Sequence, residues 1–153
     1  MAQRTEHRTA RTEDLGPALA RHRVDVARWA LQAGCSLDLD AITVLLGITY
    51  GLGAQPDPLR QVWRRDRVAE ILWSQAASWC AEAGVDLPTG TSEALWTYLT
   101  YLDEIGALRG DSLAELRAEL VASAGLDKRG RLRHPSGGRR PKAEVRQLRR
   151  RLA

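Results

Sequence analysis

The residues with the most evident chemistry are the arginines near the C-terminal end of the sequence. Residues 127–153 read DKRGRLRHPSGGRRPKAEVRQLRRRLA. A cut after Gly125 leaves 12 basic and 17 acidic residues before it, a net charge of −5, and 11 basic and two acidic residues after it, a net charge of +9. Guanidinium groups pair with phosphate and carboxylate oxygens. A basic tail on an acidic body therefore points to a polyanionic partner or to an acidic surface that the tail contacts.

Three interpretations of this tail are open. It is a solvated terminus without a specific role, an arm that neutralises nucleic-acid phosphates, or a protein-recognition segment that docks on another subunit or folds back on the acidic body. A membrane-surface helix is a weaker variant, because the apolar face of Val145, Leu148 and Leu152 is narrow and has no aromatic residue. The phosphate-binding candidates are Arg129, Arg131, Arg133, Arg139, Arg140, Lys142, Arg146, Arg149, Arg150 and Arg151.

The position of the arginines carries this inference, not their number. Only two of the 23 basic residues are lysines, and an excess of Arg, Ala and Gly is also what GC-rich codons produce. Within the tail, Gly138-Arg139-Arg140-Pro141 resembles the AT-hook, a short Gly-Arg-Pro element that enters the minor groove of DNA, with one additional arginine. The resemblance covers a few residues and implies a contact with DNA there.

A second candidate patch lies in the body, in the heptapeptide QVWRRDR. Its residues Trp63, Arg64, Arg65 and Arg67 combine an indole with guanidinium groups, as platforms for stacked nucleic-acid bases do. The alternative is that the same groups pack on one another as cation–π pairs. Neighbouring acidic residues partly neutralise these arginines, so we favour the packed arrangement.

Groups for catalysis or metal binding are sparse. Of the three histidines, His7 and His134 fall in terminal segments, and His22 lies beside arginines where we expect an exposed surface residue and not a catalytic base. Cys35 and Cys80 are too far apart for a CxxC pair, and we expect reduced, buried thiols. No group of residues has the spacing of a calcium or zinc site. We therefore expect a non-enzymatic protein without a metal or cofactor.

The elements that position these residues are predicted to be helices alone, because apolar residues recur at spacings of three and four and no stretch alternates. The expected helices begin at Pro17, after Asp38 or Asp40, after Asp57 at Pro58, after Thr91 or Ser92, and after the capping box Ser112-x-x-Glu115; all but the second end at a glycine, which is Gly34, Gly84, Gly106 and Gly125 in turn. The core is expected to hold Trp29, Trp73, Trp79 and Trp96.

Two segments of the body repeat one pattern. Residues 29–37 read WALQAGCSL and residues 79–87 read WCAEAGVDL. Each is followed by an expected helix, a Gly-Ala pair and an aspartate that starts another helix. Either one helical unit is duplicated, or the shared residues are generic helix stops, caps and core positions. In both cases two helix-loop-helix units pack together, because neither buries its apolar face alone.

The sequence predicts an all-α fold: a compact bundle of about five helices in residues 16–125, a flexible N-terminus in residues 1–15, and a basic, partly disordered tail with a short amphipathic helix in residues 126–153. We expect a cytoplasmic protein, because no apolar run approaches about 20 residues and the N-terminus lacks the apolar stretch of a signal peptide.

Its expected role is in a nucleoprotein setting, where the tail binds DNA or RNA and the body binds a protein partner or self-associates. The alternative is an adaptor or accessory subunit whose basic tail docks on an acidic protein surface.

Overall fold

The computed structural model describes residues 8–11, 15–50 and 57–132. Helices make up most of this part of the chain, which confirms the all-α prediction. In chain order they are α1 (Pro17–Gln32), α2 (Leu39–Tyr50), α3 (Arg65–Glu70), α4 (Ala76–Ala83), α5 (Thr91–Glu104) and α6 (Leu113–Ala124). A π-helical turn, Ile71–Gln75, joins α3 to α4, so residues 65–83 form one continuous helix and the described residues contain five helices.

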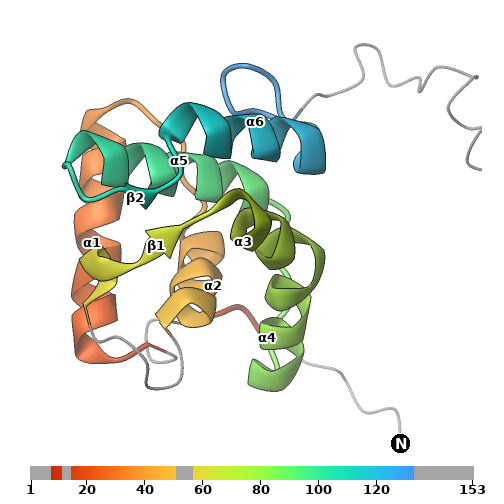
Figure 1. The fold of residues 1–153 in the computed structure, drawn as a ribbon. Coiled ribbons are helices and arrows are strands. Elements are labelled where there is room, and N and C mark those ends of the chain that lie inside the picture. Colours follow the sequence, from red (N-terminus) through yellow and green to blue (C-terminus); the bar gives the residue numbers. More distant parts are fainter. Residues whose placement is uncertain (1–7, 12–14, 51–56, 133–153) are drawn as a thin grey trace, which may run out of the picture.

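Helix α2 lies at the centre of the molecule (Figure 1), where it contacts α1, α4 and α5. Nine of its 12 residues are buried, as expected for a helix that is apolar on all sides. Helix α6 packs on α5 and on α3. The largest fully buried side chains are those of Trp63, Tyr98, Ile42, Leu45, Leu46, Ile71, Leu95, Leu99, Leu102, Leu116, Leu120 and Leu126.

The chain that follows Asp57 does not begin a long helix, and this corrects the sequence prediction. Pro58–Arg60 forms a single 3-10 turn, and Val62–Trp63 forms strand β1, which pairs in parallel with strand β2, Arg109–Gly110. The expectation of helices alone is wrong at these two short strands. The extended backbone places Trp63 in the core, where its side chain is 0 % exposed, and burial of the indole favours extended over helical backbone here.

Helix α3 takes its N-terminal cap from a distant part of the chain. The carboxylate of Asp111 accepts a hydrogen bond from the amide of Arg65 at 2.9 Å. The amide of Asp111 in turn donates to the carbonyl of Trp63 at 2.8 Å, which extends the strand pairing. Helix α6 has the predicted capping box, in which the amide of Glu115 donates to Ser112 Oγ at 3.2 Å.

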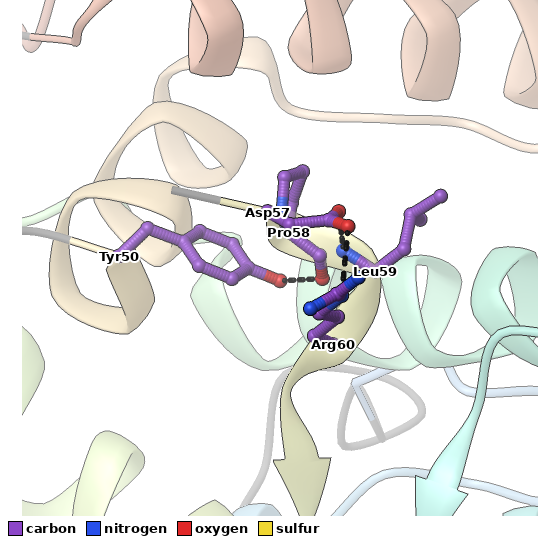
Figure 2. A network of polar contacts seen from close by, with 5 residues as sticks. All are labelled: Tyr50, Asp57, Pro58, Leu59 and Arg60. Atoms are coloured by element: carbon purple, nitrogen blue, oxygen red, sulfur yellow. Dashed lines mark hydrogen bonds and ion pairs between the residues drawn. The ribbon is translucent and has the colours of Figure 1, made fainter. Parts of the chain in front are cut away.

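The predicted cap at Asp57 is confirmed, although it serves the 3-10 turn (Figure 2). Its carboxylate accepts the amide of Leu59 at 2.9 Å and pairs with Arg60 Nε at 3.4 Å. The hydroxyl of Tyr50 donates to the carbonyl of Pro58 at 2.7 Å, so the turn is tied to the end of α2.

The other predicted caps have mixed outcomes. The carboxylate of Asp38 accepts the amides of Asp40 and Ala41 at 3.0 and 3.1 Å, which confirms it as the cap of α2. Thr91 and Ser92 do not cap α5, because the N-cap residue is Gly90. Both side chains are buried in the first turn of the helix instead.

The repeated sequence pattern corresponds to two helices that end in the same way. Gly34 and Gly84 adopt φ angles of 70° and 67°, the left-handed conformation of a glycine helix stop. The amide that follows each glycine donates to the carbonyl five residues earlier, at 2.8 and 2.9 Å. Gly106 ends α5 with the same bond, so this stop is generic. What recurs is an order of elements, two helices, a two-residue strand and a helix, in residues 17–70 and again in residues 76–124. The continuous helix of residues 65–83 ends the first series and begins the second, and only the first contains a 3-10 turn.

The folded part of the chain is longer at both ends than the predicted range 16–125. Ala10 is buried, and the carbonyl of Arg8 accepts the amide of Asp86 at 2.8 Å. Leu126 is fully buried, and Leu132 packs against the same core. Residues 8–11 and 126–132 therefore belong to the folded body, because they bury apolar surface that a loose terminus leaves in water.

Candidate functional site

A tight turn at residues 127–131, which we call the basic turn, begins the predicted basic arm and is fixed to the body. Leu126 and Leu132, on either side of the turn, form an antiparallel bridge. Between them, one carboxylate oxygen of Asp127 accepts the amides of Arg129 and Arg131 at 2.8 and 3.0 Å. The hydrogen bonds from the Arg131 and Arg129 amides lower the pKa of Asp127, because they stabilise the ionised carboxylate that holds the turn.

Gly130 brings this turn into contact with Trp96 of α5. Its φ angle is 76°, and a Cβ atom at this position would overlap the indole of Trp96. Arg117 of α6 also packs on Trp96, because its guanidinium carbon lies 4.7 Å from the ring centre. Arg117 Nη2 donates to Thr100 Oγ1 at 2.8 Å. One indole therefore connects the basic turn to a half-buried arginine.

A cleft of 730 Å³ opens beside these residues, and we call it the Arg117 cleft. Its walls come from the turn between α1 and α2, from α5, from α6 and from the basic turn. The lining residues are Gly34, Cys35, Ser36, Glu93, Trp96, Thr97, Thr100, Arg117, Asp127, Arg129, Gly130, Arg131 and Leu132.

The arginines of the predicted arm divide between described and undescribed residues. Arg129 and Arg131 are exposed at the Arg117 cleft, and the structure brings them together with Arg117, which the sequence did not indicate. The remaining candidates lie outside the described residues; they are Arg133, Arg139, Arg140, Lys142, Arg146, Arg149, Arg150 and Arg151.

The second candidate patch does not form a base-stacking platform. The indole of Trp63 is enclosed in the core and offers no open face to a base. The guanidinium carbon of Arg67 lies 5.4 Å from its ring centre, which confirms the favoured cation–π arrangement. Arg67 Nη1 also donates to Gln61 Oε1 at 2.9 Å. Arg64 and Arg65 are exposed at the start of α3.

A larger cleft of 910 Å³ lies between α2, β1, α3 and α4. Arg64 and Arg67 line it together with the acidic residues Asp66, Glu70 and Glu82. Carboxylates outnumber guanidinium groups here, so this cleft suits an anion less well than the Arg117 cleft does.

The expectation that four tryptophans lie in the core is wrong for one of them. Trp73, in the π-helical turn, is 73 % exposed, whereas Trp29, Trp79 and Trp96 are half-buried. Leu87 is also exposed, and both side chains line a small cleft of 230 Å³ that reaches Ser123 at the end of α6. We call Trp73, Leu87 and this cleft the Trp73 patch.

His22 is buried, which corrects the expectation of a surface residue. Its Nε2 atom lies 2.9 Å from the hydroxyl of Tyr98, which lies 2.7 Å from the hydroxyl of Tyr50. Because Tyr50 gives its single hydroxyl hydrogen to Pro58, Tyr98 must donate to Tyr50, and His22 Nε2–H must donate to Tyr98. Burial lowers the pKa of His22 and raises the pKa of Tyr50 to about 12. This chain of hydrogen bonds joins α1, α5, α2 and the 3-10 turn.

The two thiols have different environments. Cys80 is buried as expected, but Cys35 is exposed at the Arg117 cleft, so the prediction is wrong for Cys35. Within the described ranges, no three His, Cys, Asp or Glu residues cluster where a metal ion would bind. No helix in the same ranges is long and apolar enough to cross a membrane.

Comparison with protein-family models, curated proteins and solved structures finds no match. The Arg117 cleft is the part of the site that sequence reasoning missed. Trp96 stands on α5, Arg117 on α6 and Cys35 in the turn between α1 and α2, and no charged run or binding motif in the sequence connects them. The sequence contains one weak indication of the cleft, the glycine Gly130 within a basic segment. Only the tertiary structure shows that Gly130 fits against Trp96.

Proposed function

We propose that this chain is a small, non-enzymatic, cytoplasmic protein that acts in a nucleoprotein setting. Its C-terminal arm binds DNA or RNA through phosphate contacts, and its helical body binds a protein partner or a second copy. The observation that carries the proposal is the basic turn: the arm starts from a fixed point on the body and presents exposed arginines there.

Charge supports a phosphate contact by the arm. Residues 133–153 contain eight basic residues and one acidic residue, which leaves a net charge of −3 on residues 1–132. Arginines on a chain segment neutralise phosphates and release condensed counterions, and this contribution needs no base recognition. The acidic body alone repels a polyanion, so binding depends on the arm.

The Trp73 patch supports a protein-binding role for the body. A tryptophan exposed to 73 % is uncommon for a side chain that gains free energy from burial, and aromatic residues are enriched where proteins bind one another. The patch borders the end of α6, and the basic turn begins just after that end. A partner on the body would therefore lie near a nucleic acid held by the arm.

The experiment is a binding titration of a fluorescein-labelled oligonucleotide with two variants of equal charge change. Replacing Arg149, Arg150 and Arg151 with Gln should weaken binding at least about ten-fold at 0.1 M salt. The matched control replaces Arg21, Arg28 and Arg109, which are exposed on the body, and should weaken binding less than about three-fold. Equal losses in both variants would contradict an arm-specific contact.

The second candidate function is an adaptor that never touches nucleic acid, and the Trp73 patch favours it equally. In that case the full chain fails to bind the oligonucleotide, whereas an acidic protein domain binds to the arm. Sedimentation of the full chain and of Trp73→Arg measures self-association through the patch.

A further inference from the structure

We infer that the Arg117 cleft is a binding site for a single phosphate group, held by Arg117, Arg129 and Arg131. The inference deepens the proposed function, and it rests on that function in naming a polynucleotide as the source of the phosphate. A phosphate monoester offers the same chemistry, so the test below separates the two sources.

Arg117 has donors that the protein does not use. Its guanidinium group stacks on Trp96 and donates once, from Nη2 to Thr100 Oγ1. Its Nε atom is buried and has no hydrogen-bond partner, and among the described residues no carboxylate forms an ion pair with Arg117. A buried N–H without an acceptor is unfavourable, so an oxyanion that reaches this group would be stabilised.

The basic turn supplies two further guanidinium groups at the same cleft. Asp127 uses one carboxylate oxygen on the amides of Arg129 and Arg131, so it fixes the backbone below the two side chains. The lining of the cleft contains three arginines and two carboxylates, those of Asp127 and Glu93. Planar guanidinium groups bind phosphate oxygens in pairs, which suits an anion with several oxygens.

The environment of Trp96 favours a phosphate over a nucleobase. Gly130 and Arg117 both pack against this indole, so its surface is largely occupied by the protein. Recognition in the cleft then rests on charge and on the hydroxyl groups of Ser36 and Thr97, which line it. The Thr100 hydroxyl is already used, because it donates to the carbonyl of Trp96 at 2.8 Å. A volume of 730 Å³ also accommodates a phosphate with its attached sugar.

Cys35 provides a reporter inside the cleft, and buried Cys80 is an internal control. The experiment measures alkylation of Cys35 in the full chain by mass spectrometry, with anionic iodoacetate and neutral iodoacetamide, at constant ionic strength set with NaCl. We expect the ratio of the iodoacetate to the iodoacetamide rate to be higher at Cys35 than for N-acetylcysteine amide, because the arginines attract the anionic reagent.

Added phosphate should then protect Cys35. Inorganic phosphate, a nucleoside monophosphate and a short oligonucleotide are titrated in parallel, and each should slow iodoacetamide alkylation of Cys35 to a plateau. The double variant Arg129→Gln/Arg131→Gln, on the exposed turn, should raise the concentration for half protection at least about ten-fold. Arg117→Met tests the half-buried arginine, and Arg28→Gln on α1 is the control that should leave protection unchanged.

Each outcome decides a separate point. Protection by the oligonucleotide at a concentration at least about a hundred-fold below that of the monophosphate identifies the polynucleotide as the source, and equal protection identifies a phosphate monoester. Three results would overturn the inference. They are unchanged Cys35 reactivity with all three ligands, undiminished protection in the double variant, and protection by polyglutamate but by none of the three phosphate ligands. Oligonucleotide binding without protection of Cys35 leaves the proposed function intact, whereas protection by inorganic phosphate without oligonucleotide binding contradicts that function alone.

Discussion

At the scale of single residues, His22 links the stability of the fold to pH. Burial lowers its pKa from the ordinary value of 6.5, despite the opposing charges of Asp25 and Asp57. The unfolded chain therefore binds more protons than the folded chain as the pH falls through about 6.5, so the free energy of unfolding should decrease on acidification. Urea unfolding at several values between about pH 7.5 and pH 5 measures this decrease.

The matched variant for this prediction is His22→Gln, which keeps a donor for Tyr98 and does not titrate. It should be less stable than the natural chain at pH 7.5 and should lose part of the decrease toward pH 5. Asp127 titrates below its ordinary pKa of 3.8, outside this range, so it does not contribute. Identical pH dependence in both proteins would show that His22 has the same pKa folded and unfolded.

The tryptophans give a second prediction at this scale. Trp63→Ala should lower the free energy of unfolding by about 3–5 kcal/mol, because it empties a fully enclosed core position and leaves Arg67 without its aromatic contact. Trp73→Ala should change it by less than about 0.5 kcal/mol, because that indole is mostly in water. Thermal melting compares the two directly. The reverse ranking would mean that the core is built around Trp73.

At the scale of elements, Asp111 connects two helices and the strand pair. Asp111→Ala removes the side-chain acceptor of the Arg65 amide at the start of α3, and should lower the free energy of unfolding by about 1 kcal/mol. Asp103→Ala is the control, because this exposed residue lies near the end of α5 and caps no helix start. If both variants melt together with the natural chain, the cap contributes nothing measurable.

The sequence predicted the helices because their signals are local. Glycine stops at Gly34, Gly84 and Gly106 and the capping box at Ser112 act within one helical turn, and all are confirmed. The strand pair was missed because β1 is two residues long and depends on β2, 47 positions later in the chain. A pairing between distant segments leaves no periodic pattern in either segment.

The candidate site was predicted only in part, for the same physical reason. The charge of the tail is visible in the sequence, so Arg129 and Arg131 were named. Arg117 was missed, because its role depends on contact with Trp96 from another helix. Trp63 is absent from the expected core because arginines follow it, yet the residue alternation of a strand buries Trp63 and exposes Arg64.

At the scale of the whole molecule, the folded body should extend to Leu132 and not end at Gly125. A chain truncated after Leu132 should keep its melting midpoint, because it retains every core residue that the structure describes. A chain truncated after Gly125 loses the buried Leu126 and the packed Leu132, and should lose about 2–5 kcal/mol of unfolding free energy. Equal melting midpoints for the two truncated chains would show that residues 126–132 do not stabilise the body.

The central claim is that the arm binds phosphates, and the salt dependence of oligonucleotide binding tests it most directly. On duplex DNA, the logarithm of the affinity should fall against the logarithm of the salt concentration with a slope of about −0.9 per phosphate neutralised, and replacing Arg149, Arg150 and Arg151 should reduce the slope by up to about three units. The chain truncated after Leu132 should retain at most a weak contact. The account would be contradicted if the truncated chain bound the oligonucleotide as tightly as the full chain does, with an unchanged slope.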